Sequence, residues 1–189
     1  EKIQEAQKDK YDRVVALYTP SPELHTTYIQ QAKDMGYDVL HLNHIIDNHF
    51  IQQLEYKKDK MSFVRVDSDT PDQLIQKEDK KESVLNEKEQ EKVKELFIPL
   101  MSGKEHQLML RAMSPESHPV LITRPEFMRR MQEMQMMQGM GMDMGDHYQV
   151  IVNSNHPLIA DKLLNMRSQE KKEKFAAYLL RLAKLNQGM

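Results

Sequence analysis

The sequence predicts an α/β unit with a short parallel sheet, followed by an α+β unit in which strands and helices are mixed. Over residues 1–80, apolar runs rich in β-branched residues alternate with helical patterns, as in strands joined by crossover helices. The composition then shifts, because residues 76–81 are nearly all charged or amide-bearing. We therefore predict a small three-layer domain at 1–80 and a mixed strand and helix domain at 81–189.

The first strand and helix are marked by composition and by end signals. Residues 13–18 form a nearly continuous apolar run, which predicts a buried strand. Ser21 and Pro22 are favourable at the N-cap and first helical positions, so we expect a helix from there to Met35. Gly36 is expected to end that helix.

Two more strands and a helix complete the α/β unit. Residues 37–42 and 61–66 have the composition of buried strands. Between them, residues 45–54 have a helical pattern with Ile46, Phe50 and Leu54 on one face. This order predicts a parallel sheet with right-handed crossovers and helices on its faces.

The second unit is richer in helix. We expect helices at 87–101, 125–138, 155–164 and 168–186, and strands at 107–113, 119–123 and 148–152. The first two of these strands flank a turn that contains serine and proline. The glycine-rich residues 139–146 are expected to form a flexible loop.

The composition excludes several classes of protein. Lys plus Arg number 27 and Asp plus Glu number 29, a net charge of −2, which argues against binding to nucleic acid or to an anionic membrane. The lack of cysteine excludes a disulfide scaffold and a thiolate zinc site, and it fits a reducing cytoplasm. No apolar run reaches the ~18 residues of a membrane span, and no signal peptide is evident.

Methionine is concentrated on one predicted helix. Eight of the 15 methionines lie between Met128 and Met144, and apolar residues recur there at helical spacing. A flexible thioether face can repack against many partners, so this face is a candidate protein-binding site. The alternatives are packing against the unit's own sheet and copper binding by thioethers. The candidate binding residues are Phe127, Met128, Met131, Met134, Met137 and Met140.

The last predicted helix is apolar over more than half of its circumference. Such a helix must be buried on two sides, and one side can meet its own domain. The other is expected to meet a second copy of the chain in an isologous contact, with burial inside one domain as the alternative. The candidate interface residues are Phe175, Leu179, Leu182, Ala183 and Leu185.

No catalytic or metal-binding motif stands out. His41, His44 and His49 lie close in sequence without a cysteine, and we interpret them as packing, surface or capping residues. No glycine-rich phosphate loop is present. Two other functions stay open: an adaptor with a methionine-rich peptide groove, and a small-molecule enzyme that binds its ligand where the strands end. In the enzyme the ligand would meet Thr19, Ser21, His41, Asn43 and Asp67.

Three segments resemble the heat shock protein 90 family, in particular its bacterial HtpG branch. Residues 37–42 with 45–51 are similar to a strand and helix near the end of the family's middle domain. Residues 148–158 are similar to a strand and helix start of its C-terminal domain, and residues 183–189 to its dimerisation helices. Domain 1–80 would be the end of the middle domain, and domain 81–189 the dimerisation domain.

The resemblance implies a segment of an ATP-dependent cytoplasmic stress chaperone. The methionine-rich helix would contact unfolded or partly folded client proteins, and the parent protein would be a homodimer. ATP and magnesium would bind an N-terminal domain outside this segment, and no residue here matches the family's arginine that assists hydrolysis. We therefore expect no catalysis and no cofactor in this segment. One further helix follows in the family, so we expect weaker dimerisation than in a longer chain.

Overall fold

The structure is a computed structural model that describes residues 6–44, 46–77, 81–101, 105–137 and 147–189. The side chains at 71, 105, 106, 133, 136 and 137 lie outside the description. The chain divides into two compact units, Glu1–Asp79 and Lys80–Met189. Each unit is described by itself.

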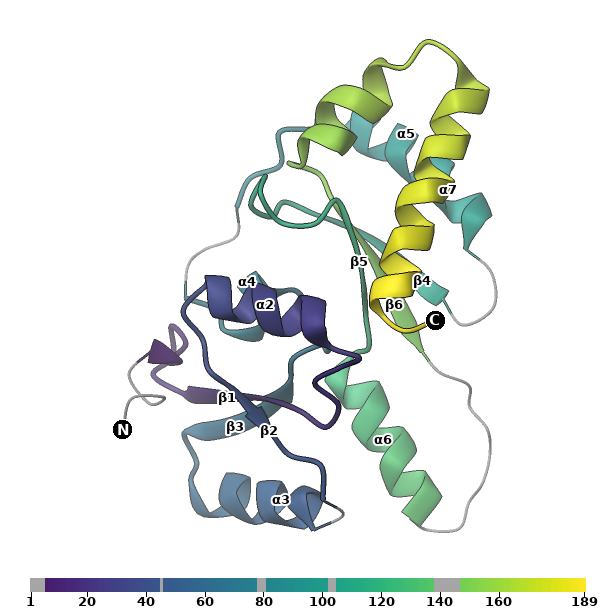
Figure 1. Cartoon of the computed structure of the whole chain (residues 1–189). Helices are drawn as coiled ribbons and strands as arrows, with labels where there is room; N and C mark the ends of the chain where they lie inside the picture. The colour runs from purple at the N-terminus through teal and green to yellow at the C-terminus, as the bar shows by residue number, and fades with distance from the viewer. Residues whose placement is uncertain (1–5, 45, 78–80, 102–104, 138–146) are drawn as a thin grey trace. The chain divides into compact units, whose positions relative to one another are not determined.

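The first unit is a three-layer α/β structure, which confirms the predicted fold class. Its elements are β1 (Val14–Thr19), α2 (Thr26–Asp34), β2 (Val39–His41), α3 (Asp47–Lys57), β3 (Met61–Arg65) and α4 (Pro71–Leu74). The sheet has the order β2-β1-β3, and both pairings are parallel. Figure 1 shows α2 and α4 on one face of this sheet and α3 on the other.

Alternation along β1 divides the core of this unit between the two faces of the sheet. Ala16 and Tyr18 pack with Ile51 of α3 and Phe63 of β3. Val15 and Leu17 therefore point to the opposite face, where α2 lies. The central strand is buried on both sides, which explains its unbroken apolar run.

The start of α2 differs from the prediction. Ser21 is not the N-cap, because residues 22–25 form a turn that separates it from the helix. The Ser21 backbone N–H instead donates a hydrogen bond to Thr19 Oγ1. The helix begins only at Thr26, with His25 at the N-cap position. The expected end is observed at Gly36, whose φ of 78° is in the left-handed region that favours glycine.

The buried side of α3 also differs from the expected stripe. Ile46 and Phe50 are 69% and 52% exposed, and Ile51 is the residue that the helix buries. The helix begins at Asp47, whose carboxylate accepts a hydrogen bond from the His44 backbone N–H at 2.8 Å. Packing of Ile51 in the core turns the helix so that Ile46 and Phe50 stay in solvent.

The second unit is a mixed α+β structure, as predicted. Its elements are α5 (Glu87–Phe97), η1 (Ile98–Leu100), β4 (Glu105–Arg111), β5 (Val120–Thr123), α6 (Glu126–Met137), β6 (Tyr148–Asn153), η2 (Leu158–Leu163) and α7 (Gln169–Asn186). The sheet order is β4-β6-β5, with β6 parallel to β4 and antiparallel to β5. Although β4 and β5 flank a turn in sequence, β6 lies between them. In this central position Val150, Ile151 and Val152 are all fully buried, as expected for an unbroken apolar run.

Helices α5 and α7 bury the core of the second unit. Val93 and Phe97 of α5 and Leu180 of α7 belong to one cluster with Val150 and Val152 of β6. Both helices have a side-chain cap at the N-terminus. Asn86 forms a reciprocal capping box with Glu89, and the Ser168 hydroxyl accepts a hydrogen bond from the Lys171 N–H.

Candidate functional site

Helix α6 stands apart from the core of the second unit. It begins just after β5 ends and extends away from the sheet face that α5 and α7 cover (Figure 1). Its described side chains are absent from the buried cluster of this unit. Among them, Phe127 and Met134 are exposed, Arg129 is buried and the others are half-buried.

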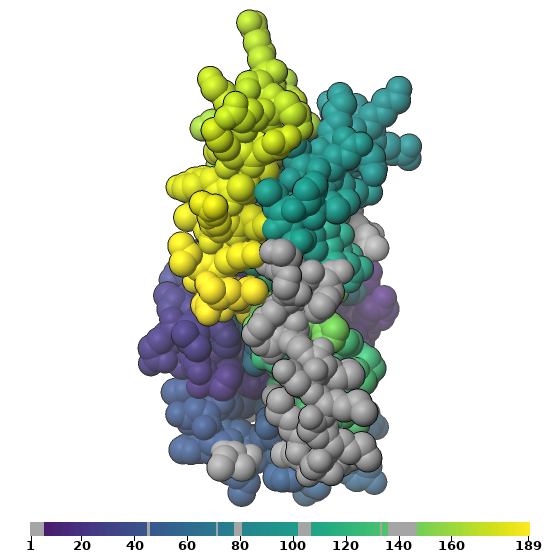
Figure 2. Space-filling view, turned by 90° about the vertical axis from the view of Figure 1, so that its right-hand side faces the viewer, coloured from purple at the N-terminus to yellow at the C-terminus, as the bar shows by residue number. Residues whose placement is uncertain are grey.

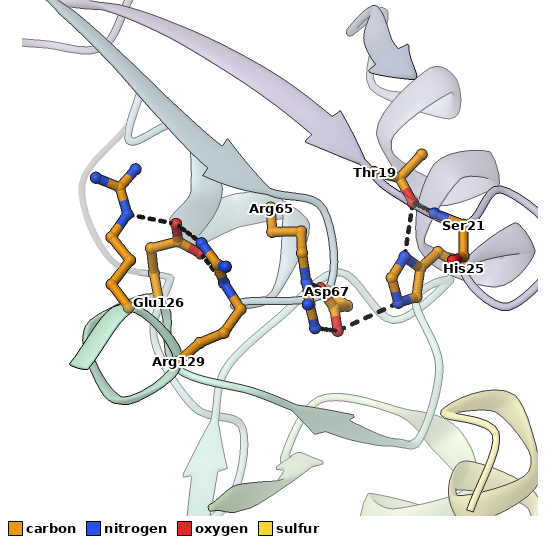
Figure 3. Close-up of polar contacts among 8 residues, drawn as sticks. Thr19, Ser21, His25, Arg65, Asp67, Glu126 and Arg129 are labelled. Carbon is orange, nitrogen blue, oxygen red and sulfur yellow. Dashed lines mark hydrogen bonds and ion pairs between the residues drawn. The ribbon is translucent and has the colours of Figure 1, made fainter. Parts of the chain in front are cut away.

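Charge pairs hold the first turn of α6. Glu126 Oε1 accepts hydrogen bonds from Arg129 Nη2 at 2.5 Å and from Arg130 Nε at 2.7 Å, as Figure 3 shows for the labelled pair. These partners are three and four positions along the helix, where side chains meet. Arg124, which lies two residues before the helix, donates a hydrogen bond to Gln132 of the helix at 2.8 Å. Polar side chains thus fix one flank of the helix.

The opposite flank carries the predicted binding residues. Phe127 is 74% exposed and Met134, two helical turns later, is 55% exposed. Met128 and Met131 are half-buried. The Met137 side chain and all of Met140 lie outside the described residues. Four of the six predicted residues are therefore seen on α6, and two of them present most of their surface to solvent.

The predicted residues of α7 divide between two sides. Leu179 and Ala183 are 3% and 2% exposed and belong to the core, and Phe175 packs partly against it. Leu182 and Leu185 are 41% and 70% exposed, on the outer side of the helix. Tyr178, which the sequence analysis did not single out, is also exposed on α7. Figure 2 shows α7 lying beside α5 on this face of the unit.

A buried polar chain in the first unit was not predicted. The Ser21 N–H donates to Thr19 Oγ1, which lies 2.7 Å from His25 Nδ1. On the other side of the ring, His25 Nε2 lies 3.4 Å from Asp67 Oδ2. Asp67 also accepts hydrogen bonds from Arg65 Nε and Nη2 at 2.5 and 2.6 Å (Figure 3). The chain joins the loop after β1, the start of α2 and the end of β3.

This chain contains a hydroxyl, an imidazole and a carboxylate, but its geometry suits structure. Thr19, His25 and Asp67 are 2%, 6% and 0% exposed, so a substrate has no direct access to the hydroxyl. Each group already has partners, and Asp67 is held by a bidentate guanidinium. Burial lowers the pKa of His25 below its ordinary value of 6.5, the Asp67 charge opposes this, and Arg65 adds to it. The imidazole is therefore neutral at pH 7. Its two ring nitrogens contact the Thr19 hydroxyl and the Asp67 carboxylate, and so link the end of β1 to the residues after β3.

The structure gives the residues of the alternative enzyme site different environments, although Thr19 and His41 are partners in the paired strands β1 and β2. Thr19 and Asp67 are joined through His25, whereas His41 and Asn43 are exposed and Ser21 is half-buried. Only the spacing of Arg65 and Asp67 could have suggested a pair, because residues two apart on an extended chain face the same side. Nothing local in the sequence identifies His25 as their partner.

The three histidines that are close in sequence lie at the surface. His41, His44 and His49 are exposed. Among the described residues, no three His, Asp or Glu side chains are placed to share a metal ion. Within the same residues, every helix is too short or too polar to cross a bilayer.

Comparison with known proteins identifies the family. The family model described as Hsp90 protein matches residues 5–188. The chaperone protein HtpG of Bacteroides fragilis is 38% identical over 181 residues, which cover 93% of this chain and 26% of that protein. HtpG of Porphyromonas gingivalis is 37% identical over 169 residues, covering 86% of this chain and 25% of the relative. The chain thus spans about a quarter of the length of the curated relatives it matches. The resemblance seen in the sequence is confirmed, and the chain belongs to the Hsp90 protein family.

Proposed function

We propose that this chain binds apolar segments of unfolded or partly folded proteins through the outer face of α6. This face, called here the α6 face, consists of Phe127, Met128, Met131 and Met134. It would serve a chaperone of the HtpG type, and the relatives' name as chaperone proteins supports that role. ATP and magnesium would be used elsewhere in the full-length protein, in its cytoplasmic setting.

The exposure of Phe127 is the observation that carries this proposal. A phenylalanine that is 74% exposed, with Met134 at 55% on the same helix, is a large apolar surface left in water. Fully burying one such side chain is worth about 1.5–3 kcal/mol. Contact with an apolar client segment would recover part of that free energy.

Side-chain chemistry favours clients of varied sequence. Methionine has an unbranched, polarizable side chain that fits irregular apolar surfaces, so several thioethers together accept many shapes. The charge pairs of Glu126 hold the helix start, so the face is presented on a fixed helix. An exposed flank of this kind supports a projecting helix more than the buried groove of an adaptor.

The test is to replace Met128, Met131 and Met134 together with serine. We expect suppression of client aggregation to fall several-fold while the midpoint of thermal unfolding moves by no more than a few degrees. The matched control is Met35→Ser, because Met35 is 40% exposed in the other unit. Unchanged aggregation suppression, or a large loss of stability, would show that these methionines do not form a client surface.

We also propose that the outer side of α7 contacts a second copy of the chain. Tyr178, Leu182 and Leu185 are exposed there, while Leu179 and Ala183 fasten the same helix to its own core. A two-fold contact between such faces would bury them in a homodimer. The second unit would then be the dimerisation domain, and the first unit the end of the middle domain.

A further inference from the structure

Sulfur in this chain is present only as thioether. The sequence has 15 methionines and no cysteine, so its reversible sulfur oxidation is limited to methionine sulfoxide. Exposure separates the described methionines sharply. Met134 is 55% exposed and is the most exposed of them, whereas Met113 is 2% exposed.

We propose that Met134 is an oxidation site through which hydroperoxides inactivate the α6 face, with Met128 and Met131 oxidised after it. This inference rests on the proposed function of the α6 face. It adds a modification site, its chemical class of reagent, and a means of regulation.

The chemistry is a two-electron oxygen transfer. The thioether sulfur attacks one oxygen of hydrogen peroxide, the O–O bond breaks, and a sulfur–oxygen bond forms. The departing hydroxide takes up the proton left on the transferred oxygen and leaves as water. Sulfur is oxidised and the peroxide is reduced, so the step needs no other reactant. Methionine sulfoxide reductases reverse the product, which makes the site switchable.

The position of Met134 explains why oxidation would matter there. Phe127, Met131 and Met134 follow one another at helical spacing, so they share one stripe. A sulfoxide introduces a strong hydrogen-bond acceptor into this stripe, and burying it against an apolar client without a donor carries a desolvation cost. Met35 and Met189 are 40% and 39% exposed but lie outside α6, so their oxidation would leave the face intact.

Peptide mapping by mass spectrometry after graded hydrogen peroxide treatment tests the site. Among the described methionines, Met134 should oxidise first and Met113 last, with at least a tenfold difference in rate. Equal rates at Met134 and Met113, or faster oxidation at Met35 than at Met134, would overturn the proposal.

Leucine replacements test the consequence. In a variant with Met128, Met131 and Met134 all changed to leucine, the face stays apolar but cannot form a sulfoxide. Peroxide should reduce aggregation suppression by the wild-type chain at least twofold more than by this variant, and methionine sulfoxide reductase should restore it. The control Met35→Leu should lose activity as the wild type does. Equal losses in the wild type and the triple variant would contradict the proposal.

Assays of the untreated proteins distinguish failure of the oxidation proposal from failure of the proposed client-binding function. If the untreated wild-type chain fails to suppress aggregation, the proposed function fails, while the order of oxidation can still be measured. If the untreated chain suppresses aggregation and the fully oxidised chain does so equally well, only the oxidation proposal fails.

Discussion

His25 Nε2 lies 3.4 Å from Asp67 Oδ2, and the same carboxylate accepts two hydrogen bonds from Arg65. The contact links the start of α2 to the end of β3 inside the first unit. With the imidazole neutral, Asp67 is paired with the positive charge of Arg65. Protonation of His25 would add a second positive charge to this buried group.

Acid should therefore destabilise the first unit in a defined pH range. The pKa of His25 is lowered in the folded chain, chiefly by burial, so below pH 6.5 the unfolded chain takes up a proton that the folded chain refuses. The free energy of unfolding should be insensitive to this group above pH 6.5 and should fall as the pH drops below it. Hydrogen exchange at the Val66 amide measures this free energy of unfolding. In His25→Gln the fall between pH 6.5 and 5 should be smaller, and an unchanged fall would contradict the account.

Asp67→Asn should be severely destabilising. The change removes the carboxylate charge from the buried pair of Asp67 with Arg65, and breaking such a pair costs about 3–5 kcal/mol. Urea denaturation followed by circular dichroism gives the loss. The matched control, Asp38→Asn at an exposed position, should change stability by less than about 0.5 kcal/mol. Similar effects of the two changes would show that the pair is not structurally important.

Removal of the capping box should weaken the second unit by a modest amount. Asn86 accepts a hydrogen bond from the Glu89 N–H at 3.0 Å, and the Glu89 carboxylate accepts one from the Asn86 N–H at 3.0 Å. We expect Asn86→Ala to cost about 1 kcal/mol in thermal or urea unfolding. Lys88→Ala, an exposed change in the same turn, is the control. A loss no larger than that of the control would mean that the cap is not formed in solution.

His118 should influence the titration of His156. Burial lowers the pKa of His156, and the charge of His118 lowers it further. In His118→Gln the pKa of His156 should rise but stay below 6.5, because burial is the larger cause. Its carbon-bound ring protons, followed by NMR across pH 4–8, report the shift. An unchanged or lowered pKa would show that the two rings do not interact.

The two sides of α7 should respond differently to serine. Leu182→Ser with Leu185→Ser should weaken self-association in sedimentation velocity without changing stability, because both side chains are exposed. Leu179→Ser should instead cost several kcal/mol of unfolding free energy, because it places a polar group in the core. If the double change leaves self-association untouched, the outer side of α7 is not the interface.

Local patterns were enough to predict most elements of the fold. The apolar run of β1 is buried as predicted, and α5 and α7 start at or next to the first residues of the predicted helices at 87–101 and 168–186. Helical spacing likewise puts Phe127, Met131 and Met134 on one flank of α6, and their role in binding stays a prediction.

Non-local contacts explain what the sequence did not predict. At the start of α2, His25 contacts Asp67, which is remote in sequence. The central position of β6 depends on pairing with two strands that precede it in the chain. Likewise, the exposure of Ile46 and Phe50 follows from the rotation that packing gives α3. None of these is encoded in a window of neighbouring residues.

The most direct test of the α6 face is NMR of methyl-labelled methionines during titration with an unfolded client protein. We expect the methyl signals of Met131 and Met134 to shift or broaden as client is added, while that of the buried Met113 stays in place. A titration in which the client binds and these two α6 signals do not move would contradict the central claim.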